Sequence, residues 1–391
     1  MRRAGLEGVW PAVAEIVGDV RARGDAALLD WSERLDGTRP KAFRVPAKRL
    51  AAARLEEDEL AALRRMAEAV AAFCRPQRPQ DTVVEAVPGV IAERRWMPIA
   101  SVGVYVPSGR SPLPSSLVMA VVPAQVAGVK RIAVATPRPG DAILATAREL
   151  GVDEIYQIGG AQAVAAFAYG TETIPAVDKI VGPGNSYVTT AKLLVSGVVG
   201  IDLPAGPSEV VVIADAGADP AVCAADLLAQ AEHGADSDGL LLTPDPVLSD
   251  AVASLVVGYD NVRVELVESL EEALVRSEAY APEHLELLVD DPEPLLARVR
   301  NAGTVFVGTS AVVGDYAAGA SHVLPTGGLA RAAGGLGLEA FLKPLQIVRA
   351  SADGLAAARE LVVPLARLEG LPRHAAALEV RFEATTPKVA R

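Results

Sequence analysis

Histidine is rare in this chain, and its four copies all lie in the C-terminal half. They are His233, His284, His322 and His374, in a chain of 391 residues. Imidazole is the side chain that titrates nearest to neutral pH, and in its neutral form it is a common metal ligand. Each of the four is therefore a candidate for proton transfer or metal binding.

Other metal-binding side chains occur near these histidines. Gln230 and His233 are three residues apart in one predicted helical segment, which places an amide oxygen and an imidazole nitrogen within reach of a single ion. Asp315 and His374 would add a carboxylate and a second imidazole. A divalent ion held by these four groups would keep a net positive charge and act as a Lewis acid. A polar stripe on a surface helix is the alternative interpretation of the first pair.

Glu283 and His284 are adjacent, and they are the two kinds of side chain best suited to moving protons near neutral pH. Pro282 precedes them, and proline is favoured in the first turn of a helix. We therefore predict a helix start here that orients both side chains. A solvated helix end without a catalytic role is the alternative.

Short β-rich runs alternate with Ala-rich helical segments from about residue 101 onward. This order is typical of βαβ crossovers, which build parallel sheets covered by helices on both faces. The runs are 102–106, 132–135, 155–158, 179–181, 210–213, 240–242, 262–266, 285–289 and 305–307. Together they exceed one sheet of ordinary width. The sequence therefore predicts an α/β protein with two Rossmann-like doubly wound domains and a short helical C-terminal tail.

The turn at 182–185 lies between a predicted strand and a predicted helix, where backbone N–H groups can bind a phosphate. The dinucleotide fingerprint would require a third glycine where Tyr187 stands, so a structural turn is the alternative. Tyr105 lies at the end of the predicted strand 102–106, and Gln162 follows the predicted strand 155–158 closely. Ligands of open α/β sheets bind along that edge.

The composition excludes several classes of protein. With 37 Lys and Arg against 49 Asp and Glu, the net charge of −12 argues against nucleic-acid binding. Cys74 and Cys223 form no C-x-x-C pair, which indicates a reducing compartment. The longest apolar stretch, 118–129, is too short to cross a bilayer, and Glu7 interrupts the N-terminus before a signal peptide could form. We expect a soluble, cytoplasmic protein that binds neither nucleic acid nor membrane.

The order of motifs along the chain is more specific than any one of them. The motifs are Val102-Gly103-Val104-Tyr105-Val106-Pro107, Gly159-Gly160-Ala161-Gln162-Ala163, Val181-Gly182-Pro183-Gly184-Asn185, Pro204-Ala205-Gly206-Pro207-Ser208-Glu209, Gln230-Ala231-Glu232-His233-Gly234, Ala281-Pro282-Glu283-His284-Leu285, Gly314-Asp315-Tyr316-Ala317 and His322-Val323-Leu324-Pro325-Thr326. In this order they closely resemble the histidinol dehydrogenase family, over about residues 17–380.

The resemblance implies an NAD-dependent enzyme that oxidises L-histidinol to L-histidine through the aldehyde, in the last two steps of histidine biosynthesis. It implies two NAD⁺ per histidine and one bound Zn²⁺. The zinc ligands would be Gln230, His233, Asp315 and His374, and these residues would also contact the substrate, because zinc in this family binds the substrate's nitrogens.

The resemblance also assigns the proton-transfer roles. His284 would remove the alcohol proton as hydride leaves for NAD⁺, and Glu283 would contact the substrate and activate water for the second oxidation. Separate roles for adjacent residues suit a substrate that is oxidised twice without leaving. Ser208, His322 and Glu369 would complete the substrate contacts.

Three regions of the chain would then divide the work. Residues 1–104 together with 209–335 would form the first α/β domain, which carries most metal and proton-transfer residues. Residues 105–208 would bind NAD through Tyr105, Gln162 and Asn185. Residues 336–391 would form a dimerisation tail that places Glu369 and His374 in the active site of the partner subunit.

Two positions depart from the family pattern. Ser108 stands where the family usually has glycine, and Lys343 is followed by Pro-Leu-Gln where a Met-Thr type of run is usual. These departures keep open a related zinc- and NAD-dependent dehydrogenase of another amino alcohol or of a hydroxylated sulfonate. A zinc hydrolase, with Glu283 activating metal-bound water, is a further alternative. A non-catalytic metal-binding protein would leave the Glu283–His284 pair unexplained.

Overall fold

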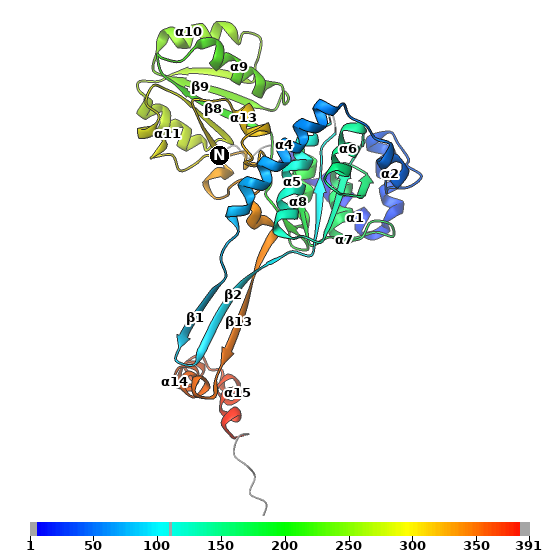
Figure 1. Ribbon diagram of the computed structural model, residues 1–391, viewed down its shortest axis with the longest axis vertical. Helices are drawn as coiled ribbons and strands as arrows, with labels where there is room; N and C mark the ends of the chain where they lie inside the picture. Colours follow the sequence, from blue (N-terminus) through cyan, green and yellow to red (C-terminus); the bar gives the residue numbers. More distant parts are fainter. Residues whose placement is uncertain (1–5, 109–111, 384–391) are drawn as a thin grey trace, which may run out of the picture. The chain divides into compact units, whose positions relative to one another are not determined.

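The computed structural model describes residues 6–108 and 112–383 (Figure 1). The outer ends of the predicted first domain and of the predicted tail lie outside these residues. The chain forms two compact units. Unit 1 comprises Met1–Arg78 and Ile99–Phe341, and unit 2 comprises Pro79–Pro98 and Leu342–Arg391. Within the described ranges, no helix is long and apolar enough to span a bilayer.

The first sheet of unit 1 has five parallel strands in the order β5-β4-β3-β6-β7. The strands are β3 (Ser101–Tyr105), β4 (Arg131–Thr136), β5 (Glu154–Gln157), β6 (Lys179–Val181) and β7 (Gly200–Ile201). The crossover helices are α5 (Pro114–Ala127), α6 (Asp141–Glu149), α7 (Gly160–Tyr169) and α8 (Ser186–Val195). Every residue of β3 is buried, as expected for a central parallel strand with both faces covered.

The N-terminal helices belong to this first sheet. They are α1 (Leu6–Arg23), α2 (Asp25–Asp36), α3 (Ala47–Ala52) and α4 (Glu57–Cys74), followed by the 3₁₀ turn η1 (Arg75–Gln77). Helix α1 packs on α7 and α8, and α4 packs on α5. Val13, Ile16 and Trp31 share a buried cluster with Tyr105 and Phe167. This grouping differs from the predicted one, in which 1–104 joined 209–335, because the apolar faces of these helices are buried against the first sheet and its helices.

The second sheet of unit 1 is also parallel, in the order β10-β9-β8-β11-β12. Its strands are β8 (Glu209–Ala214), β9 (Asp238–Thr243), β10 (Val262–Leu266), β11 (His284–Leu288) and β12 (Thr304–Val307). Its helices are α9 (Pro220–Ala231), α10 (Pro246–Leu255), α11 (Leu270–Tyr280), α12 (Glu293–Leu296) and α13 (Ala311–Tyr316), with the 3₁₀ turns η2 (Leu329–Arg331) and η3 (Leu338–Phe341) after them. Separate apolar clusters cover its two faces.

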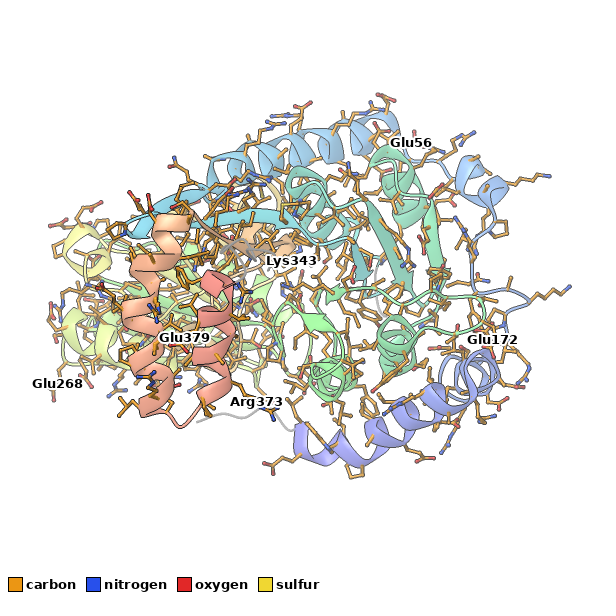
Figure 2. All side chains as sticks on the ribbon, turned by 90° about the horizontal axis from the view of Figure 1, so that it is seen from below. Glu56, Glu172, Glu268, Lys343, Arg373 and Glu379 are labelled. Atoms are coloured by element: carbon orange, nitrogen blue, oxygen red, sulfur yellow. The ribbon has the colours of Figure 1, made fainter. Side chains whose placement is uncertain are left out.

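Unit 2 is a three-stranded antiparallel sheet with two helices. The strands β1 (Thr82–Val87), β2 (Val90–Pro98) and β13 (Leu342–Ala350) are ordered β1-β2-β13. The helices α14 (Ala352–Leu368) and α15 (Pro372–Glu383) pack on each other, and Glu379 of α15 lies 3.7 Å from Arg359 of α14 (Figure 2). The predicted tail, 336–391, is helical over α14 and α15, but it also contains η3 of unit 1 and strand β13, which the sequence patterns did not indicate.

Candidate active site

A pocket of about 850 Å³ opens in unit 1, at the carboxyl edge of the first sheet. Its wall contains all three predicted NAD contacts, Tyr105, Gln162 and Asn185. The same wall contains His233 and Asp315, two of the predicted zinc ligands. The fold thus brings together residues from two sheets that are up to 210 positions apart in sequence, which the predicted separation into two domains did not require.

Glu283 is buried directly before β11, not at a helix start as predicted. Ala281 adopts a left-handed conformation after α11, and strand β11 then begins at His284. The Ser208 hydroxyl donates to Oε2 of Glu283 at 2.5 Å, and the Glu209 backbone N–H donates to the same oxygen at 2.9 Å. Burial raises the pKa of Glu283 to about 8, although both hydrogen bonds oppose that shift.

The backbone carbonyl of Glu209 holds the His284 side chain. Its Nδ1 lies 3.2 Å from the carbonyl oxygen of Glu209. Because a carbonyl only accepts, Nδ1 carries the proton and Nε2 keeps its lone pair. Burial lowers the pKa of His284 to about 4, and the ring packs on Phe306 with centroids 5.8 Å apart. The peptide groups of Glu209 therefore fix both candidate proton-transfer side chains.

Gln230 and His233 lie at the end of α9. The helix ends at Ala231, so His233 follows it in a turn instead of extending the helical face as predicted. The Nδ1 of His233 lies 3.3 Å from the carbonyl oxygen of Gln230. A metal-binding histidine commonly donates its second N–H in this way, which leaves Nε2 for the ion. The Gln230 side chain is buried, and its Nε2 has no hydrogen-bond partner among the described residues.

Asp315 of α13 faces His233 across the pocket. Burial raises its pKa to about 6, and the His233 ring partly offsets that shift. The neighbouring His322 donates from Nδ1 to the Asp315 carbonyl at 3.3 Å, and its Nε2 accepts from Ser116 at 3.2 Å. Both nitrogens of His322 are thus engaged inside the protein. Sequence reasoning missed Ser116, which lies on α5 of the first sheet.

The remaining predicted residues belong to unit 2. Glu369 caps the C-terminus of α14, and His374 lies in the first turn of α15; both are exposed. Within the described part of the chain, no three His, Cys, Asp or Glu side chains form a metal-binding group. The predicted ligand set would not form such a group within unit 1, since there it contains one histidine, one aspartate and one amide, and it stays a prediction.

The predicted NAD contacts on one side of the pocket are held by hydrogen bonds. Asn185 caps α8 by accepting from the backbone N–H groups of Tyr187 and Val188, at 3.1 and 3.2 Å. The Tyr105 hydroxyl accepts from the Gly160 N–H at 3.2 Å. Gln162 donates from Nε2 to Asp36 at 3.3 Å. Asp36 went unnoticed in the sequence because it ends a helix far from any strand end.

A buried ion pair secures the turn that carries Asn185. Lys192 of α8 is ion-paired with Asp202, and its Nζ also donates to the carbonyls of Gly182 and Leu203 at 3.0 and 2.8 Å. The second oxygen of Asp202 accepts from the Gly182 N–H at 2.7 Å. Gly182 has φ +116°, and a Cβ there would lie 2.1 Å from the Tyr105 carbonyl oxygen. Glycine is therefore required at 182.

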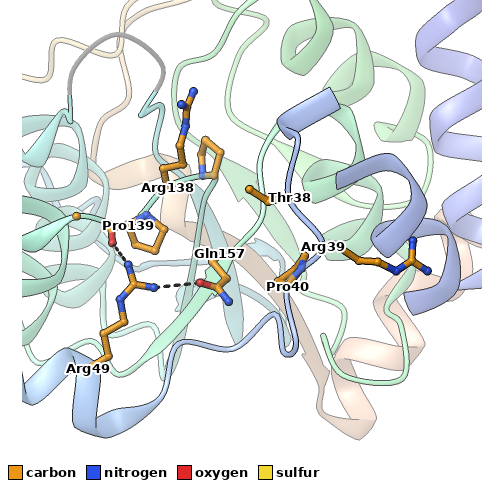
Figure 3. Close-up of a pocket in the computed structure, with 9 residues that line it drawn as sticks. Thr38, Arg39, Pro40, Arg49, Arg138, Pro139 and Gln157 are labelled. Atoms are coloured by element: carbon orange, nitrogen blue, oxygen red, sulfur yellow. Dashed lines mark hydrogen bonds between the residues drawn. The ribbon is translucent and has the colours of Figure 1, made fainter. Parts of the chain in front are cut away.

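A second cavity of about 430 Å³ adjoins the 850 Å³ pocket and shares Pro137 and Arg138 with it (Figure 3). Its Arg49 donates to the Pro139 carbonyl at 2.6 Å and to Gln157 at 3.1 Å. Arg39 points away from Gln157 and forms ion pairs on α2. The side chains of Arg49 and Arg39 are thus both engaged in contacts within the protein.

Ser108, which stands where the resemblance leads us to expect glycine, is buried in the wall of the 850 Å³ pocket. Its hydroxyl oxygen accepts from the backbone N–H of Arg138 at 3.0 Å and from Thr136 at 3.2 Å. The serine thus joins the turn after β3 to the turn after β4, a link that glycine could not make.

Comparison with known proteins decides the family. The family described as histidinol dehydrogenase matches this chain over residues 2–382. The chain belongs to the histidinol dehydrogenase family. It is 44% identical to histidinol dehydrogenase of Vibrio parahaemolyticus, over 97% of this chain and 93% of that protein. It is 41% identical to the Methanosarcina mazei enzyme, over 97% and 94% of the two chains.

The fold agrees with a solved member of the histidinol dehydrogenase family. The crystal structure of the enzyme from Elizabethkingia anophelis superposes with a TM-score of 0.90 at 36% identity, over 96% of this chain and 92% of that one. The predictions of the family and of an α/β fold with parallel sheets are confirmed. As a member of this family, the protein is an oxidoreductase of histidine biosynthesis that acts on a small molecule.

Proposed function

We propose that the protein oxidises L-histidinol to L-histidine through the aldehyde, with two NAD⁺ per turnover and one bound zinc ion. The observation that carries this proposal is the pair Glu283–His284, whose pKa values burial shifts in opposite directions, to about 8 and about 4. One backbone unit, that of Glu209, holds both side chains. Titratable neighbours with strongly displaced pKa values are typical of acid–base sites.

His284 acts in our proposal as the base for the alcohol proton. Its low pKa keeps the ring neutral at pH 7, and the Nδ1–H donated to Glu209 leaves Nε2 to take a proton. Because the ring is clamped by this hydrogen bond and by Phe306, it needs no reorientation before it acts.

Glu283 acts in the second oxidation, as the base that activates water at the aldehyde. It must be ionised for this role, and its pKa near 8 places that ionisation just above neutral pH. The Ser208 hydroxyl and the Glu209 N–H bind the ionised form, so deprotonation does not leave the carboxylate without partners. Ser208, predicted as a substrate contact, thus also orients Glu283.

The donor set of unit 1 suits zinc. The Nε2 of His233 is left available by the Nδ1 hydrogen bond, Asp315 supplies a carboxylate, and the buried amide of Gln230 lacks a hydrogen-bond partner at Nε2. We assign these three residues and His374 as the ligands. When bound, zinc would hold the substrate's nitrogens and lower the pKa of its alcohol. His322 would contact the substrate by giving up its hydrogen bond from Ser116.

NAD⁺ would occupy the pocket along Tyr105, Gln162 and Asn185. The Tyr105 ring forms part of an apolar wall, and Arg138 lines the same pocket with a positive charge suited to the pyrophosphate. The Asn185 oxygen already caps α8, which leaves its amide N–H groups to donate to the cofactor.

We further propose a cytoplasmic homodimer in which Glu369 and His374 complete the partner's site. Unit 2 exposes apolar side chains on both its sheet and its helices, as a surface covered by another chain would. Those with the largest exposed fractions are Val83 at 65%, Val84 at 59%, Val348 at 69% and Leu368 at 82%. Both cysteines are free and buried, which suits a reducing compartment.

The test is the stoichiometry of NADH release with L-histidinol. We expect two NADH per histidine formed, and loss of activity on chelation with recovery on adding Zn²⁺. No NADH from zinc-loaded protein would refute the proposal, and one NADH with a different amino alcohol would favour the related dehydrogenase. Mixing a His374→Ala variant with a Glu283→Gln variant tests the dimer, because mixed dimers should regain one intact site.

A further inference from the structure

Two carboxyl groups, Glu286 of β11 and Asp226 of α9, lie under the candidate site without an assigned role. Glu286 is fully buried, and its Oε1 accepts a hydrogen bond from the backbone N–H of Ala311 at 2.6 Å. Its Oε2 and the Oδ2 of Asp226 are buried and have no hydrogen-bond partner among the described residues. Burial, and then the adjacent Asp226 side chain, raise the pKa of Glu286 to about 8, so Glu286 keeps its proton at neutral pH.

The pair sits one helical turn from a candidate metal ligand on each of two helices. Ala311 is the first residue of α13, and Asp315 follows it by four residues. Asp226 precedes Gln230 by four residues on α9. Residues four apart lie on the same face of a helix. The carboxyl pair therefore links α13 to β11 and α9. On each helix the link lies one turn before the candidate ligand, Asp315 or Gln230.

Helix α13 depends on such contacts for its position. It has only six residues, and a helix of that length has little stability of its own. Gly314 packs so closely on Phe306 of β12 that a Cβ would lie 2.5 Å from the ring. This contact sets the distance of α13 from the sheet, whereas the hydrogen bond from Ala311 to Glu286 sets its position along its own axis.

We propose that Glu286 and Asp226 are a positioning pair, which fixes α13 relative to α9 and so sets the spacing of Asp315 and Gln230 for a divalent ion. The inference rests on the proposed metal site. Neither residue touches substrate or cofactor in this role. Groups that orient metal ligands commonly change metal affinity by about 10- to 100-fold when removed.

The experiment compares Glu286→Ala with Glu286→Gln. Zinc affinity is measured by competition with a chromogenic chelator, and backbone hydrogen exchange at Ala311 and Val312 is measured in the metal-free protein. We expect Glu286→Ala to weaken zinc binding about 10- to 100-fold and to speed both exchanges. Glu286→Gln should stay near wild type, because the amide oxygen still accepts from Ala311 and the amide nitrogen donates to Asp226.

Asp245→Ala is the matched control. Asp245 also accepts from a helix-start N–H at 2.6 Å, that of Leu248, but its helix α10 carries no candidate site residue. It should lower the melting temperature without changing zinc affinity. Asp226→Ala should weaken zinc binding as Glu286→Ala does, and the double variant should lose little more, because the pair acts as one unit.

Unchanged zinc affinity in Glu286→Ala, or an equal loss in Asp245→Ala, would overturn the proposal. If wild-type protein itself binds no zinc, the proposed metal site fails, and hydrogen exchange then decides this inference separately. Faster exchange in Glu286→Ala but not in Glu286→Gln would still support the role of Glu286 in fixing the position of α13. Identical exchange in Glu286→Ala and wild type would refute that role.

Discussion

The two parallel sheets of unit 1 contribute to the pocket in different ways. Around the first sheet, two polar groups at the carboxyl edge each have several partners: Lys192 pairs with Asp202 and two carbonyls, and Asn185 pairs with the start of α8. Around the second sheet, burial shifts the pKa values of Glu283 and His284 away from their ordinary values. In the proposed function, the first sheet would provide the binding geometry and the second would provide titratable groups for proton transfer.

This difference follows from what each half must do in the proposed reaction. The side chains that would bind the cofactor neither gain nor lose a proton, so paired hydrogen bonds suffice there. A proton-transfer group must change its charge during turnover. Burial brings the pKa of Glu283 toward neutral pH, and it keeps the His284 ring neutral and able to accept a proton. Substitutions around each of the two sheets test this division.

The largest effect should come from the proton-transfer pair. His284→Asn keeps a donor to the Glu209 carbonyl but removes the base, and we expect kcat to fall by roughly 10²- to 10⁴-fold. Glu283→Gln should keep the first NADH but slow the second by a similar factor. Single-turnover measurements of NADH release separate the two steps.

The exposed Glu268, labelled in Figure 2, provides a control, since Glu268→Gln should leave both steps unchanged. If His284→Asn or Glu283→Gln kept most of the wild-type rate, that side chain would have no part in the chemistry.

The buried Lys192 should be the largest stability determinant of the first sheet's edge. Lys192→Met leaves the buried Asp202 without its counter-ion, which destabilises proteins by about 3–5 kcal/mol. Urea unfolding measures this loss. Replacing both partners, in Lys192→Met with Asp202→Leu, should recover part of it. Lys343→Met, at an exposed position of β13, should have little effect; an equally small effect of Lys192→Met would show that the ion pair is not structural.

The raised pKa of Glu283 should be visible in how the free energy of unfolding changes with pH. Its pKa is raised from 4.5 to about 8, so the folded state holds a proton that the unfolded state has lost, and stability falls as pH rises through this window. His284, lowered from 6.5 to about 4, has the opposite effect between those values. The effect of His284 ends at about pH 6.5, so from pH 6.5 to 8 the free energy of unfolding still falls. Glu283 contributes at most about 1.4 kcal/mol per pH unit to this fall.

Melting curves of Glu283→Gln and wild type at pH 6.5 to 8 provide the measurement. The variant should lose less stability over this range, although Glu286 continues to contribute to the decline. Parallel curves for the two proteins would mean that Glu283 is not buried as a neutral acid.

The smallest effect should come from Asn185. Asn185→Ala removes the cap of α8 and should lower stability by about 1 kcal/mol, and it should also raise KM for NAD⁺. Asn185→Asp keeps a capping oxygen but loses the amide donors. It should restore stability while KM for NAD⁺ stays high; a normal KM in both variants would remove Asn185 from the cofactor site.

The fold was predictable where burial is uniform along a strand. Runs such as 210–213 are apolar throughout because parallel strands are covered on both faces, and they match the observed strands to within one or two residues. The sheet of unit 2 gave no such signal. Strand β13 carries lysine, proline, glutamine and arginine and is largely exposed, so neither alternation nor an apolar run marks it.

Local rules failed where tertiary context overrode them. Pro282 indicates a helix start, but its segment follows a left-handed residue and enters a central strand, because β11 is buried between β8 and β12. The N-terminal helices show amphipathic periodicity, but periodicity does not say which sheet they cover. Their contacts with α5, α7 and α8 place them on the first.

By itself, the sequence determined the alternation of strands and helices, the acidic charge, and the order of the motifs that identify the family. It could not show that the backbone of Glu209 holds both Glu283 and His284, that Ser116 reaches His322, or that Lys192 secures the turn at 182. These are contacts between distant segments, and they depend on side-chain direction and burial. Displaced pKa values likewise arise only when folding removes water from a charged group, so the chemistry of the pair was decided by the tertiary structure.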